Sequence, residues 1–422
     1  MKKLNFCEFL PAYETERGDA CAPYDCGYGN TAISVLATSL SEFSAYTAEM
    51  AKFATLYAEN KIADNLFLTF LVLQADKEYA VHFAYYPIHG NARIVWGERG
   101  FLPALDDSVR NSGDVRTSVL QYARNGVFNG RTATGAPGMA YLITLANGNF
   151  IIIDGGPRQR EEHFTKRLEN GEWIDCARDA EDDCDKLYRL LCERTPTGQK
   201  PIIEAWFITH SHSDHVDLAY DFLGKYKDAV DVRIAAYNLP DPSVNPVKHE
   251  NNEVLFGLRE GIQNRLADAG AVHWDIRSGQ RMSFAGCEVE ILHTHEDYFP
   301  KSFSWCNHTS SAFRFKFNGK TFMVAGDCEN DICQMMADKY GKELKSDILQ
   351  PTHHGVNGAS VAFNSAVDPQ ICLWPIDVYR FNTDGRVLGT LRGYEFNWLM
   401  RSEEFGHREH YHNSEDTEIF TD

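Results

Sequence analysis

Apolar runs separated by short polar turns fill most of the chain after residue 113, in the pattern of buried strands. The clearest run is PIIEAWFITH (201–210), which leads directly into a histidine-rich loop. Asn147-Gly148 and Asn318-Gly319 each separate a pair of apolar runs, which predicts two β-hairpins. Further strands are expected at 232–239, 287–295, 346–352 and 371–376. Runs this apolar are typical of sheets that are covered on both faces.

Helices are predicted between these strands. Residues 251–270 have helical periodicity and end on Gly270, a residue type that is common just past the end of a helix. A second helix is expected at 329–341. Strands that alternate with helices predict an α/β fold for this part of the chain.

Residues 1–113 follow a different pattern. Phe43, Tyr46 and Met50 recur at helical spacing, which predicts an amphipathic helix over 39–60 with Ser41 as its N-cap. Aromatic and β-branched runs then predict three strands, at 65–74, 78–88 and 92–98.

The polar, non-periodic segment 102–114 is expected to be a linker. We therefore divide the chain into an N-terminal α+β accessory domain, 1–113, and a larger domain, 114–422. The larger domain includes a set of C-terminal elements over 379–422.

Composition narrows the class of function. The chain has 41 Lys and Arg against 60 Asp and Glu, a net charge of −19, which argues against a long nucleic-acid duplex or an anionic membrane as partner. Its 11 cysteines show no paired spacing, and its first residues contain no apolar segment of signal-peptide length. The longest apolar run, 65–73, is too short to cross a bilayer. These features predict a reduced, cytoplasmic protein.

The segment Thr209–His215, THSHSDH, carries the chemistry. His210 and His212 point to the same side of an extended strand end, and the loop that follows can turn Asp214 and His215 back toward them. Neutral imidazole and carboxylate are ligands that zinc and similar divalent metals prefer. The segment therefore predicts a metal site at the end of a buried strand.

This segment resembles the second motif, HxHxDH, of the metallo-β-lactamase-fold hydrolases. The resemblance runs from about residue 136 to at least 376 and includes four further motifs in the expected order. The residues that match them are Asp154 in IIIDGG, His308 in NHTSSAF, Asp327 in VAGDCE and His353 in QPTHHG. The resemblance implies an αββα four-layer sandwich with metals at one edge of the sheets, to which residues 1–113 are an addition.

The His-His-Gly of the fifth motif is typical of one branch of this family. That branch includes the hydrolase domain attached to bacterial DNA-uptake channels and the phosphorylcholine esterases.

The resemblance also implies a role for each residue. One metal takes His210, His212 and His308, the other takes Asp214, His215 and His353, and Asp327 bridges the two. Asp154 holds the metal loop by hydrogen bonds, and Asp214 also orients the nucleophile or protonates the leaving group. Zinc fits this ligand set best, and manganese or iron also suit it.

Two assignments stay open at this point. His293 and His295, in ILHTHED, compete with His308 for the third motif, in which Asn307 stands where the family has glycine. His354 competes with His353 for the metal. Whichever of these two does not bind metal is available to donate a proton or to contact the substrate.

The expected activity is hydrolysis by a hydroxide that two divalent metal ions share. The branch favours a phosphoester or phosphodiester in a small-molecule substrate, and a lactone or thioester is the alternative. Two alternatives belong to other classes: a di-iron redox protein and a non-catalytic binding module. The first would need a flavin-binding partner domain, whose fingerprint residues 1–113 lack. The intact ligand set argues against the second.

Overall fold

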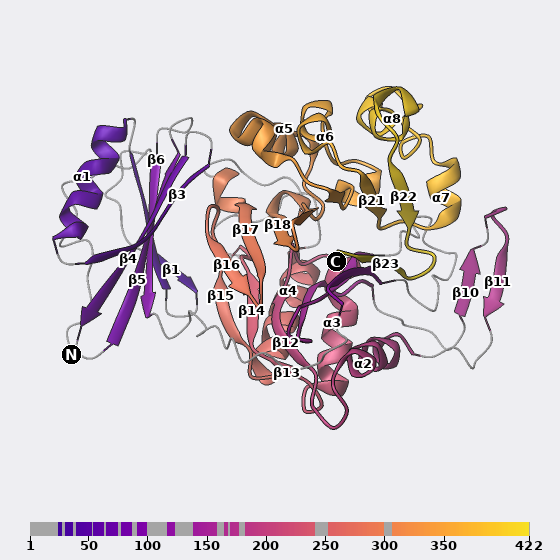
Figure 1. Cartoon of the computed structure of the whole chain (residues 1–422), viewed down its shortest axis with the longest axis horizontal. Coiled ribbons are helices and arrows are strands. Elements are labelled where there is room, and N and C mark those ends of the chain that lie inside the picture. The colour runs from indigo at the N-terminus through magenta and orange to yellow at the C-terminus, as the bar shows by residue number, and fades with distance from the viewer. Residues whose placement is uncertain are drawn as a thin grey trace. The chain divides into compact units, whose positions relative to one another are not determined.

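The structure is a computed structural model of the whole chain (Figure 1). It describes residues 24–27, 30–36, 39–52, 54–62, 65–74, 77–86, 91–98, 116–122, 138–157, 164–167, 169–176, 182–240, 252–298 and 306–421. The chain separates into two compact units, Met1–Ala104 with Ser278–Gln280, and Leu105–Arg277 with Arg281–Asp422. The linker predicted at 102–114 lies outside the described residues.

The smaller unit contains an antiparallel sheet of six described strands in the order β1-β2-β6-β5-β4-β3. Its elements are β1 (Tyr24–Gly27), β2 (Asn30–Leu36), α1 (Leu40–Ala51), β3 (Thr55–Ile62), β4 (Asn65–Gln74), β5 (Lys77–Tyr86) and β6 (Asn91–Glu98). The ring of Phe43 in α1 stacks on that of Tyr85 in β5, with centroids 5.0 Å apart. The three predicted strands are confirmed as β4, β5 and β6.

The helix predicted over 39–60 is confirmed only as far as Ala51. Phe43, Tyr46 and Met50 are buried, as their spacing predicts. Beyond them Thr55–Ile62 form β3 and pair with β4, because cross-strand packing outweighs a helical pattern at the edge of a sheet. The N-cap is Ser39 rather than Ser41, since its Oγ accepts a hydrogen bond from the Glu42 amide at 3.3 Å.

The larger unit contains two large sheets. The first has eight described strands, in the order β15-β14-β12-β9-β8-β7-β23 with β13 paired to β12. Its strands are β7 (Ser118–Gln121), β8 (Ala140–Thr144), β9 (Phe150–Asp154), β12 (Ile202–Phe207), β13 (Asp231–Val232), β14 (Ile234–Tyr237), β15 (Val272–Asp275) and β23 (Thr417–Phe420).

The second sheet has seven described strands, ordered β16 to β22 as in the sequence. They are β16 (Arg281–Phe284), β17 (Cys287–His293), β18 (Ala312–Phe317), β19 (Lys320–Val324), β20 (Ile348–Leu349), β21 (Ile371–Trp374) and β22 (Glu409–His412). A separate hairpin pairs β10 (Phe164–Arg167) with β11 (Trp173–Cys176). Both predicted Asn-Gly hairpins are confirmed, as β8–β9 and β18–β19.

Helices accompany both sheets. They are α2 (Asp183–Arg194), α3 (Ser213–Tyr226), α4 (Asn252–Asp268), α5 (Asn330–Tyr340), α6 (Val361–Val367), α7 (Val378–Thr383) and α8 (Glu395–Arg401). Short 3-10 helices cover His295–Tyr298, Cys306–Thr309, Gly341–Leu344, Thr352–Gly355 and Glu403–Phe405. The helices predicted at 251–270 and 329–341 are confirmed as α4 and α5.

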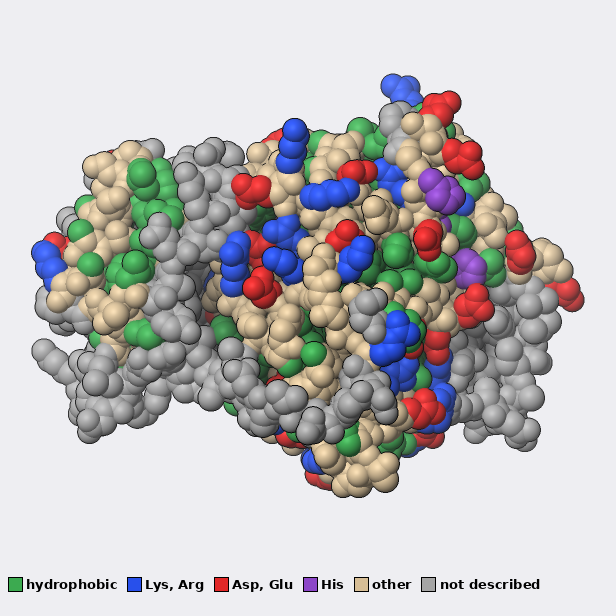
Figure 2. Space-filling view, viewed as in Figure 1, with side chains coloured by type: hydrophobic (Ala, Val, Ile, Leu, Met, Phe, Trp, Pro, Cys, Tyr) green, Lys and Arg blue, Asp and Glu red, His purple; other side chains and the backbone are tan. Residues whose placement is uncertain are grey.

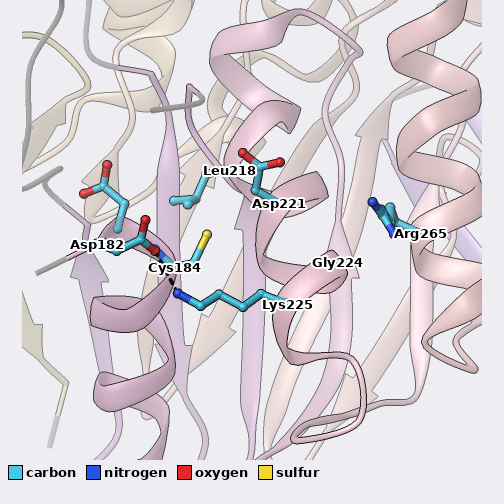
Figure 3. Close-up of a pocket in the computed structure, with 8 residues that line it drawn as sticks. Asp182, Cys184, Leu218, Asp221, Gly224, Lys225 and Arg265 are labelled. Atoms are coloured by element: carbon cyan, nitrogen blue, oxygen red, sulfur yellow. Dashed lines mark hydrogen bonds and ion pairs between the residues drawn. The ribbon is translucent and has the colours of Figure 1, made fainter. Parts of the chain in front are cut away.

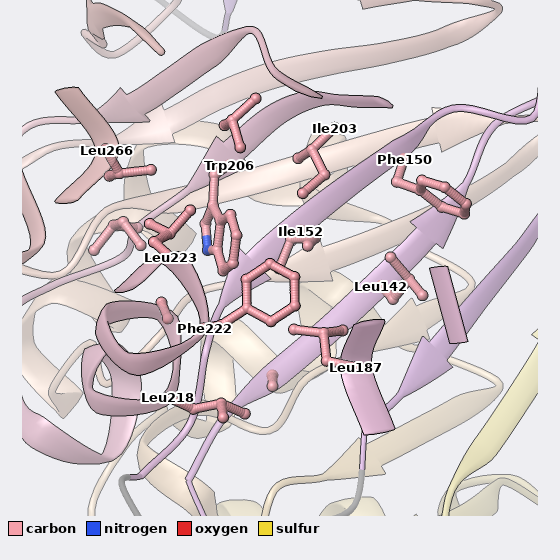
Figure 4. Close-up of a cluster of buried hydrophobic side chains, with 14 of the residues drawn as sticks. Leu142, Phe150, Ile152, Leu187, Ile203, Trp206, Leu218, Phe222, Leu223 and Leu266 are labelled. Atoms are coloured by element: carbon pink, nitrogen blue, oxygen red, sulfur yellow. The ribbon is translucent and has the colours of Figure 1, made fainter. Parts of the chain in front are cut away.

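The first sheet is buried on both faces, as its continuous apolar runs predict. Phe150 and Ile152 of β9 face a core that includes Phe222 and Leu223 of α3 (Figure 4). The alternate residues of β9 face a second core, which the inner side chains of the second sheet complete. In Figure 1, α5 and α6 lie on the side of the second sheet away from α2 and α3. The predicted four-layer sandwich is confirmed by this arrangement.

Two features tie the sheets together. The hydroxyl of Tyr141 in β8 donates to the carbonyl of Leu373 in β21 at 3.0 Å, across the inner core. The C-terminal segment also joins both sheets, because β22 pairs with β21 in the second sheet and β23 pairs with β7 in the first. The C-terminal elements over 379–422 therefore supply one strand to each sheet.

Charged side chains of both signs mix on the surface. On the face of the larger unit shown in Figure 2, basic side chains lie among acidic ones. Arg281, for example, is 3.1 Å from Glu290. None of the described helices combines the length and the hydrophobicity that spanning a bilayer requires.

Candidate metal centre

The predicted ligands come together where strands of both sheets end. Asp154 is the last residue of β9, and the THSHSDH segment follows β12, which runs parallel to β9. Asp327 follows β19, and the His353-His354 pair follows β20, which runs parallel to β19. Because parallel strands end at the same edge of their sheet, both sheets deliver their polar residues to one place.

Two groups of ligand atoms form at this edge, and Asp327 belongs to both. The first group is His210, His212 and Asp327, and the second is Asp214, His215, Asp327 and His354. In each group the ligand atoms lie within 4.8 Å of one another. Such spacing is what two neighbouring metal ions with a shared carboxylate require.

Asp154 fixes the orientation of His215 from beneath the site. Its side chain is fully buried, and Oδ2 lies 2.7 Å from Nδ1 of His215. Thr209 donates to the same carboxylate twice, through its amide to Oδ1 and its hydroxyl to Oδ2, both at 2.7 Å. The carboxylate is an acceptor, so Nδ1 of His215 carries a proton and Nε2 is the atom that faces Asp327, 3.3 Å from Oδ1.

Thr209 fixes the ring orientation of His210 through a hydrogen bond at Nδ1, as Asp154 does for His215. The Thr209 hydroxyl has one proton, which it donates to Asp154, so it can only accept from Nδ1 of His210, 3.1 Å away. Nε2 of His210 then lies 3.0 Å from Nδ1 of His212 and 3.9 Å from Oδ2 of Asp327. Sequence reasoning gave Thr209 no role, although its position directly before the first histidine of the motif was a usable signal.

His354 presents Nε2 as well. Its Nδ1 lies 2.8 Å from the carbonyl oxygen of Pro375, which can only accept, so Nδ1 is the protonated nitrogen. Nε2 lies 3.1 Å from Oδ2 of Asp214 and 3.5 Å from Oδ2 of Asp327. All three buried histidines thus hold Nδ1 in a hydrogen bond and turn Nε2 toward the two carboxylates.

The charges of the site depend on each other. Burial disfavours the imidazolium of His354, but Asp327 and Asp214 outweigh it and raise the pKa of His354 to about 10. Burial also lowers the pKa of His215, but the carboxylates of Asp327, Asp214 and Asp154 have the larger effect. Together they raise this pKa well above its usual range. Burial and the neighbouring His215 and His212 hold the pKa of His210 well below the usual value.

The donor set fits divalent cations. Nε2 of His215, Nε2 of His354 and Oδ1 of Asp327 are buried without a hydrogen-bond partner. Buried polar atoms are almost always partnered, because leaving them unpaired is unfavourable. Imidazole nitrogen and carboxylate oxygen are the ligands that zinc, manganese and iron take, so bound metal ions would satisfy all three atoms.

Two predicted ligands lie outside both groups. The ring of His353 is placed beside Glu329, 3.3 Å from Nδ1, and beside Asn307, whose Nδ2 is 3.3 Å from Nε2. Nε2 of His308 faces Asp331 at 3.4 Å. Of the two histidines that compete for the fifth motif, the second ligand group contains His354, while Nε2 of His353 lies 3.8 Å from Oδ2 of Asp327.

The two alternatives for the third motif also lie outside the groups. His293 ends β17 and is fully buried, with Nδ1 3.3 Å from Oδ2 of Asp297. His295 begins the 3-10 helix that follows. The described residues therefore bring no third-motif histidine into either ligand group.

Close backbone contacts hold the start of α3 in place. A Cβ on Gly138 would lie 1.8 Å from the carbonyl oxygen of Asp214, and a Cβ on Gly155 would lie 2.6 Å from Ala219. The Met139 amide donates to the Asp214 carbonyl at 3.1 Å. These glycines let the chain pass close to the helix that carries Asp214 and His215, a requirement that the sequence alone did not reveal.

A separate cavity of about 370 Å³ opens among α2, α3 and α4 (Figure 3). Lys225 reaches Asp182 there, at 3.6 Å. The thiol of Cys184 is buried, and burial together with Asp182 raises its pKa, so it stays protonated. No group of three ligand atoms forms in this cavity among the described residues.

The sequence offers three basic residues as contacts for a substrate phosphate: Lys301, Arg314 and Arg380. Arg314 is committed elsewhere, since its Nε donates to Glu290 at 3.1 Å. Arg380 lies in α7, and Lys301 falls outside the described residues.

Comparison with known proteins gives distant likenesses only. No protein-family model matches the chain, and no curated protein matches it. The diiron β-hydroxylase CmlA from Streptomyces venezuelae is similar over 73% of this chain at 11% identity, with a TM-score of 0.39. This chain covers 55% of that protein's length, just over half.

Two shorter proteins are similar over more of their own length. A protein from Parabacteroides distasonis, named as a metal-dependent hydrolase, matches over 69% of this chain and 99% of its own, with 15% identity and a TM-score of 0.31. A Thermotoga maritima protein, named as a zinc-dependent hydrolase of the metallo-β-lactamase superfamily, matches over 69% and 97%, with 9% identity and a TM-score of 0.27. Likenesses at these TM-scores leave the reaction to be argued from the site itself.

Proposed function

We propose that this chain is a metal-dependent hydrolase that holds two divalent cations at the ends of β12, β19 and β20. One observation carries the proposal. Three buried histidines, His210, His215 and His354, each have Nδ1 held in a hydrogen bond and Nε2 turned toward shared carboxylates. In His215 and His354 this nitrogen is buried without a hydrogen-bond partner, and a purely structural cluster of histidines has no reason to leave it so twice.

The ligand sets follow from the two groups of atoms. His210, His212 and Asp327 would hold one cation, and Asp214, His215, His354 and Asp327 the other. In this proposal His354 takes the place that the motif comparison gave to His353. Zinc remains the preferred metal, with manganese or iron as alternatives.

Cations bound there would lower the pKa of a water molecule and polarise the bond to be cleaved. The protein residues have distinct tasks around them. Asp214 is the most accessible of the three aspartates at the site, with 31% of its side chain exposed against 3% for Asp327 and 0% for Asp154. It is therefore the group placed to orient a nucleophile or to pass a proton to a leaving group. Asp154 and Thr209 fix the ring orientations of His215 and His210.

The substrate class we favour is a small phosphoester or phosphodiester. The His-His-Gly motif supports this choice by its resemblance to the esterase branch, and the net charge of −19 supports a small substrate over a long duplex. A lactone or thioester is the alternative reaction. The cluster of Asn307, Glu329 and His353 beside the ligands gives the substrate polar groups to meet in either case.

The test combines metal analysis with a substrate panel. Elemental analysis of purified protein should give close to two divalent metals per chain. Chromogenic phosphodiesters, lactones and thioesters are then assayed with wild type, Asp214→Ala and the control Asp228→Ala, an exposed position near the far end of α3. Hydrolysis should fall at least about 100-fold in Asp214→Ala and stay unchanged in Asp228→Ala.

Three results would go against the proposal. A folded sample with a metal content near zero would remove the dinuclear site. Hydrolysis that survives in Asp214→Ala would remove the assigned role of that carboxylate. Two irons per chain without hydrolysis of any ester would favour the di-iron redox alternative.

A further inference from the structure

The loop that carries His354 has an unusual backbone. His353, His354 and Gly355 follow one another with φ of 47°, 55° and 77°. Left-handed conformations are disfavoured for residues with a side chain, so two histidines in succession need outside support. Gly355 admits no side chain at all, because a Cβ there would lie 2.3 Å from the Trp374 ring.

The loop is anchored on both sides of His354. Before it, the His353 amide donates to the carbonyl of Gly326, next to Asp327, at 3.0 Å. After it, the Gly355 carbonyl accepts a hydrogen bond from Nδ2 of Asn397 at 2.6 Å. Since the carbonyl direction of Gly355 depends on the dihedral angles of the loop, this second anchor keeps the left-handed turn from relaxing.

Asn397 comes from a distant part of the chain. It lies in α8, within the crossover from β21 to β22 that also contains α7 (Figure 1). Its side chain is 2% exposed, and the same Nδ2 also donates to the carbonyl of Arg386 at 2.8 Å. The two protons of this amide nitrogen therefore link the loop that carries His354 to Arg386, in the turn over 384–389.

We infer that Asn397 is a positioning residue that holds His354 in the conformation in which its Nε2 reaches Asp214 and Asp327. The inference rests on the proposed function in that it takes His354 as a metal ligand. The crossover from β21 to β22 then supports the metal centre, because the side chain of Asn397 connects α8 to the loop that carries His354.

Asn364 offers a matched control. It is an equally buried asparagine in α6, and its Nδ2 donates to the carbonyl of Phe396, also in α8, at 3.1 Å. Asn364→Ala removes one buried hydrogen bond to α8 but none to the loop that carries His354. A loss at one metal-binding step that is seen with Asn397→Ala and not with Asn364→Ala therefore follows from the hydrogen bonds of Asn397 to Gly355 and Arg386, and only the bond to Gly355 reaches the loop that carries His354.

The experiment measures metal affinity site by site. Protein stripped with a chelator is titrated with Zn²⁺ against a chromophoric chelator, and with Co²⁺ for its visible spectrum, and the unfolding temperature of the metal-free form is recorded. Asn397→Ala should weaken one of two binding steps about 10–100-fold and change the Co²⁺ bands of that site, with the other step unchanged. Asn364→Ala should lower the unfolding temperature yet bind both metals as wild type does.

The outcomes separate the two proposals. If wild type binds two metals and Asn397→Ala binds both equally well, the positioning role is wrong while the dinuclear site stands. If wild type binds fewer than two metals, both proposals are wrong. Asn397→Ser, which keeps a short polar side chain, is measured in parallel so that a folding failure of the alanine variant does not end the test.

Discussion

Nδ1 of His354 lies 2.8 Å from the carbonyl oxygen of Pro375, whereas Nδ1 of its neighbour His353 lies 3.3 Å from Glu329. The two adjacent rings therefore point into different surroundings. Nε2 of His354 lies 3.1 Å from Asp214 and 3.5 Å from Asp327. Nε2 of His353 lies 3.3 Å from the amide nitrogen of Asn307 and 3.8 Å from Asp327.

This difference predicts unequal effects of two similar substitutions. His354→Gln should reduce the metal content from two toward one per chain and weaken the second site more than about 100-fold, beyond the effect usual for a supporting residue. His353→Gln should keep two metals. Elemental analysis after dialysis against a weak chelator distinguishes the variants, and the reverse pattern would restore His353 as the ligand.

Asp154 should matter for metal binding although it touches no metal. Asp154→Asn keeps the shape but presents an amide to three hydrogen-bond donors, so the orientation of His215 is lost and metal affinity should fall about 10–100-fold. Asp347→Asn is the control, because Asp347 accepts from the amide and hydroxyl of Thr321 in the same pattern, with no histidine in it. Equal metal affinity in both variants would contradict the role of Asp154.

Gly138 should tolerate no side chain. An alanine Cβ would lie 1.8 Å from the Asp214 carbonyl oxygen and 2.5 Å from Pro157, and the carbonyl oxygen cannot move without shifting the first turn of α3. Gly138→Ala should lower the free energy of unfolding by about 1–3 kcal/mol, the usual effect of overpacking, and should weaken the second metal site. Urea unfolding and metal titration check both effects.

The matching control for that substitution is Gly261→Ala. Gly261 lies inside α4, where the nearest neighbour of an added Cβ is the Tyr220 ring at 3.3 Å. An alanine in a helix interior is favoured by up to about 1 kcal/mol over glycine, so this variant should be neutral or more stable. A similar loss in both variants would mean that the contact with Asp214 is not what Gly138 protects.

His410 should make stability depend on pH. Burial, together with Arg401 and Arg408, lowers the pKa of His410 to about 4, and its Nδ1 accepts a hydrogen bond from the Trp374 indole at 3.0 Å. The unfolded chain binds this proton near pH 6.5, and the folded chain binds it only near pH 4. The contribution of His410 to the free energy of unfolding should therefore be fully present above pH 6.5. It should decrease by up to about 3 kcal/mol as the pH falls toward 4.

Chelator-treated protein gives the cleanest measurement of this effect. Urea unfolding between pH 4 and 7.5 should show a smaller slope for His410→Gln than for wild type. His407→Gln, at an exposed position three residues away, should change the slope far less, because His407 is the smallest of the contributions that lower the pKa of His410. Identical slopes for all three proteins would show that His410 does not stay neutral in the folded state.

Local chemistry explains which features the sequence predicted well. Asn147-Gly148 makes a hairpin because Gly148 takes φ of 80° and the Asn147 side chain accepts from the Asn149 amide. The THSHSDH segment forms a site because neighbours in sequence follow one strand into one helix. Each signal consists of residues that are close neighbours in sequence, where the chain has little freedom to arrange them otherwise.

The features that the sequence did not predict depend on distant contacts. The orientations of His353 and His354 depend on a left-handed turn, on Pro375 and on Asn397, which lies 42 residues from Gly355. The end of the first helix at Ala51 is set by the pairing of β3 with β4. The same periodic pattern is compatible with either outcome until the partner strand is placed.

The pairing of β23 with β7 has a consequence for how the protein is made. Ser118 in β7 donates to Glu418 in β23, and the two residues are 300 positions apart in the chain. The ribosome synthesises β7 long before β23, so β7 has no partner strand on one side until β23 emerges. Until then the backbone groups at this edge of the sheet can pair with other chains unless a chaperone covers them.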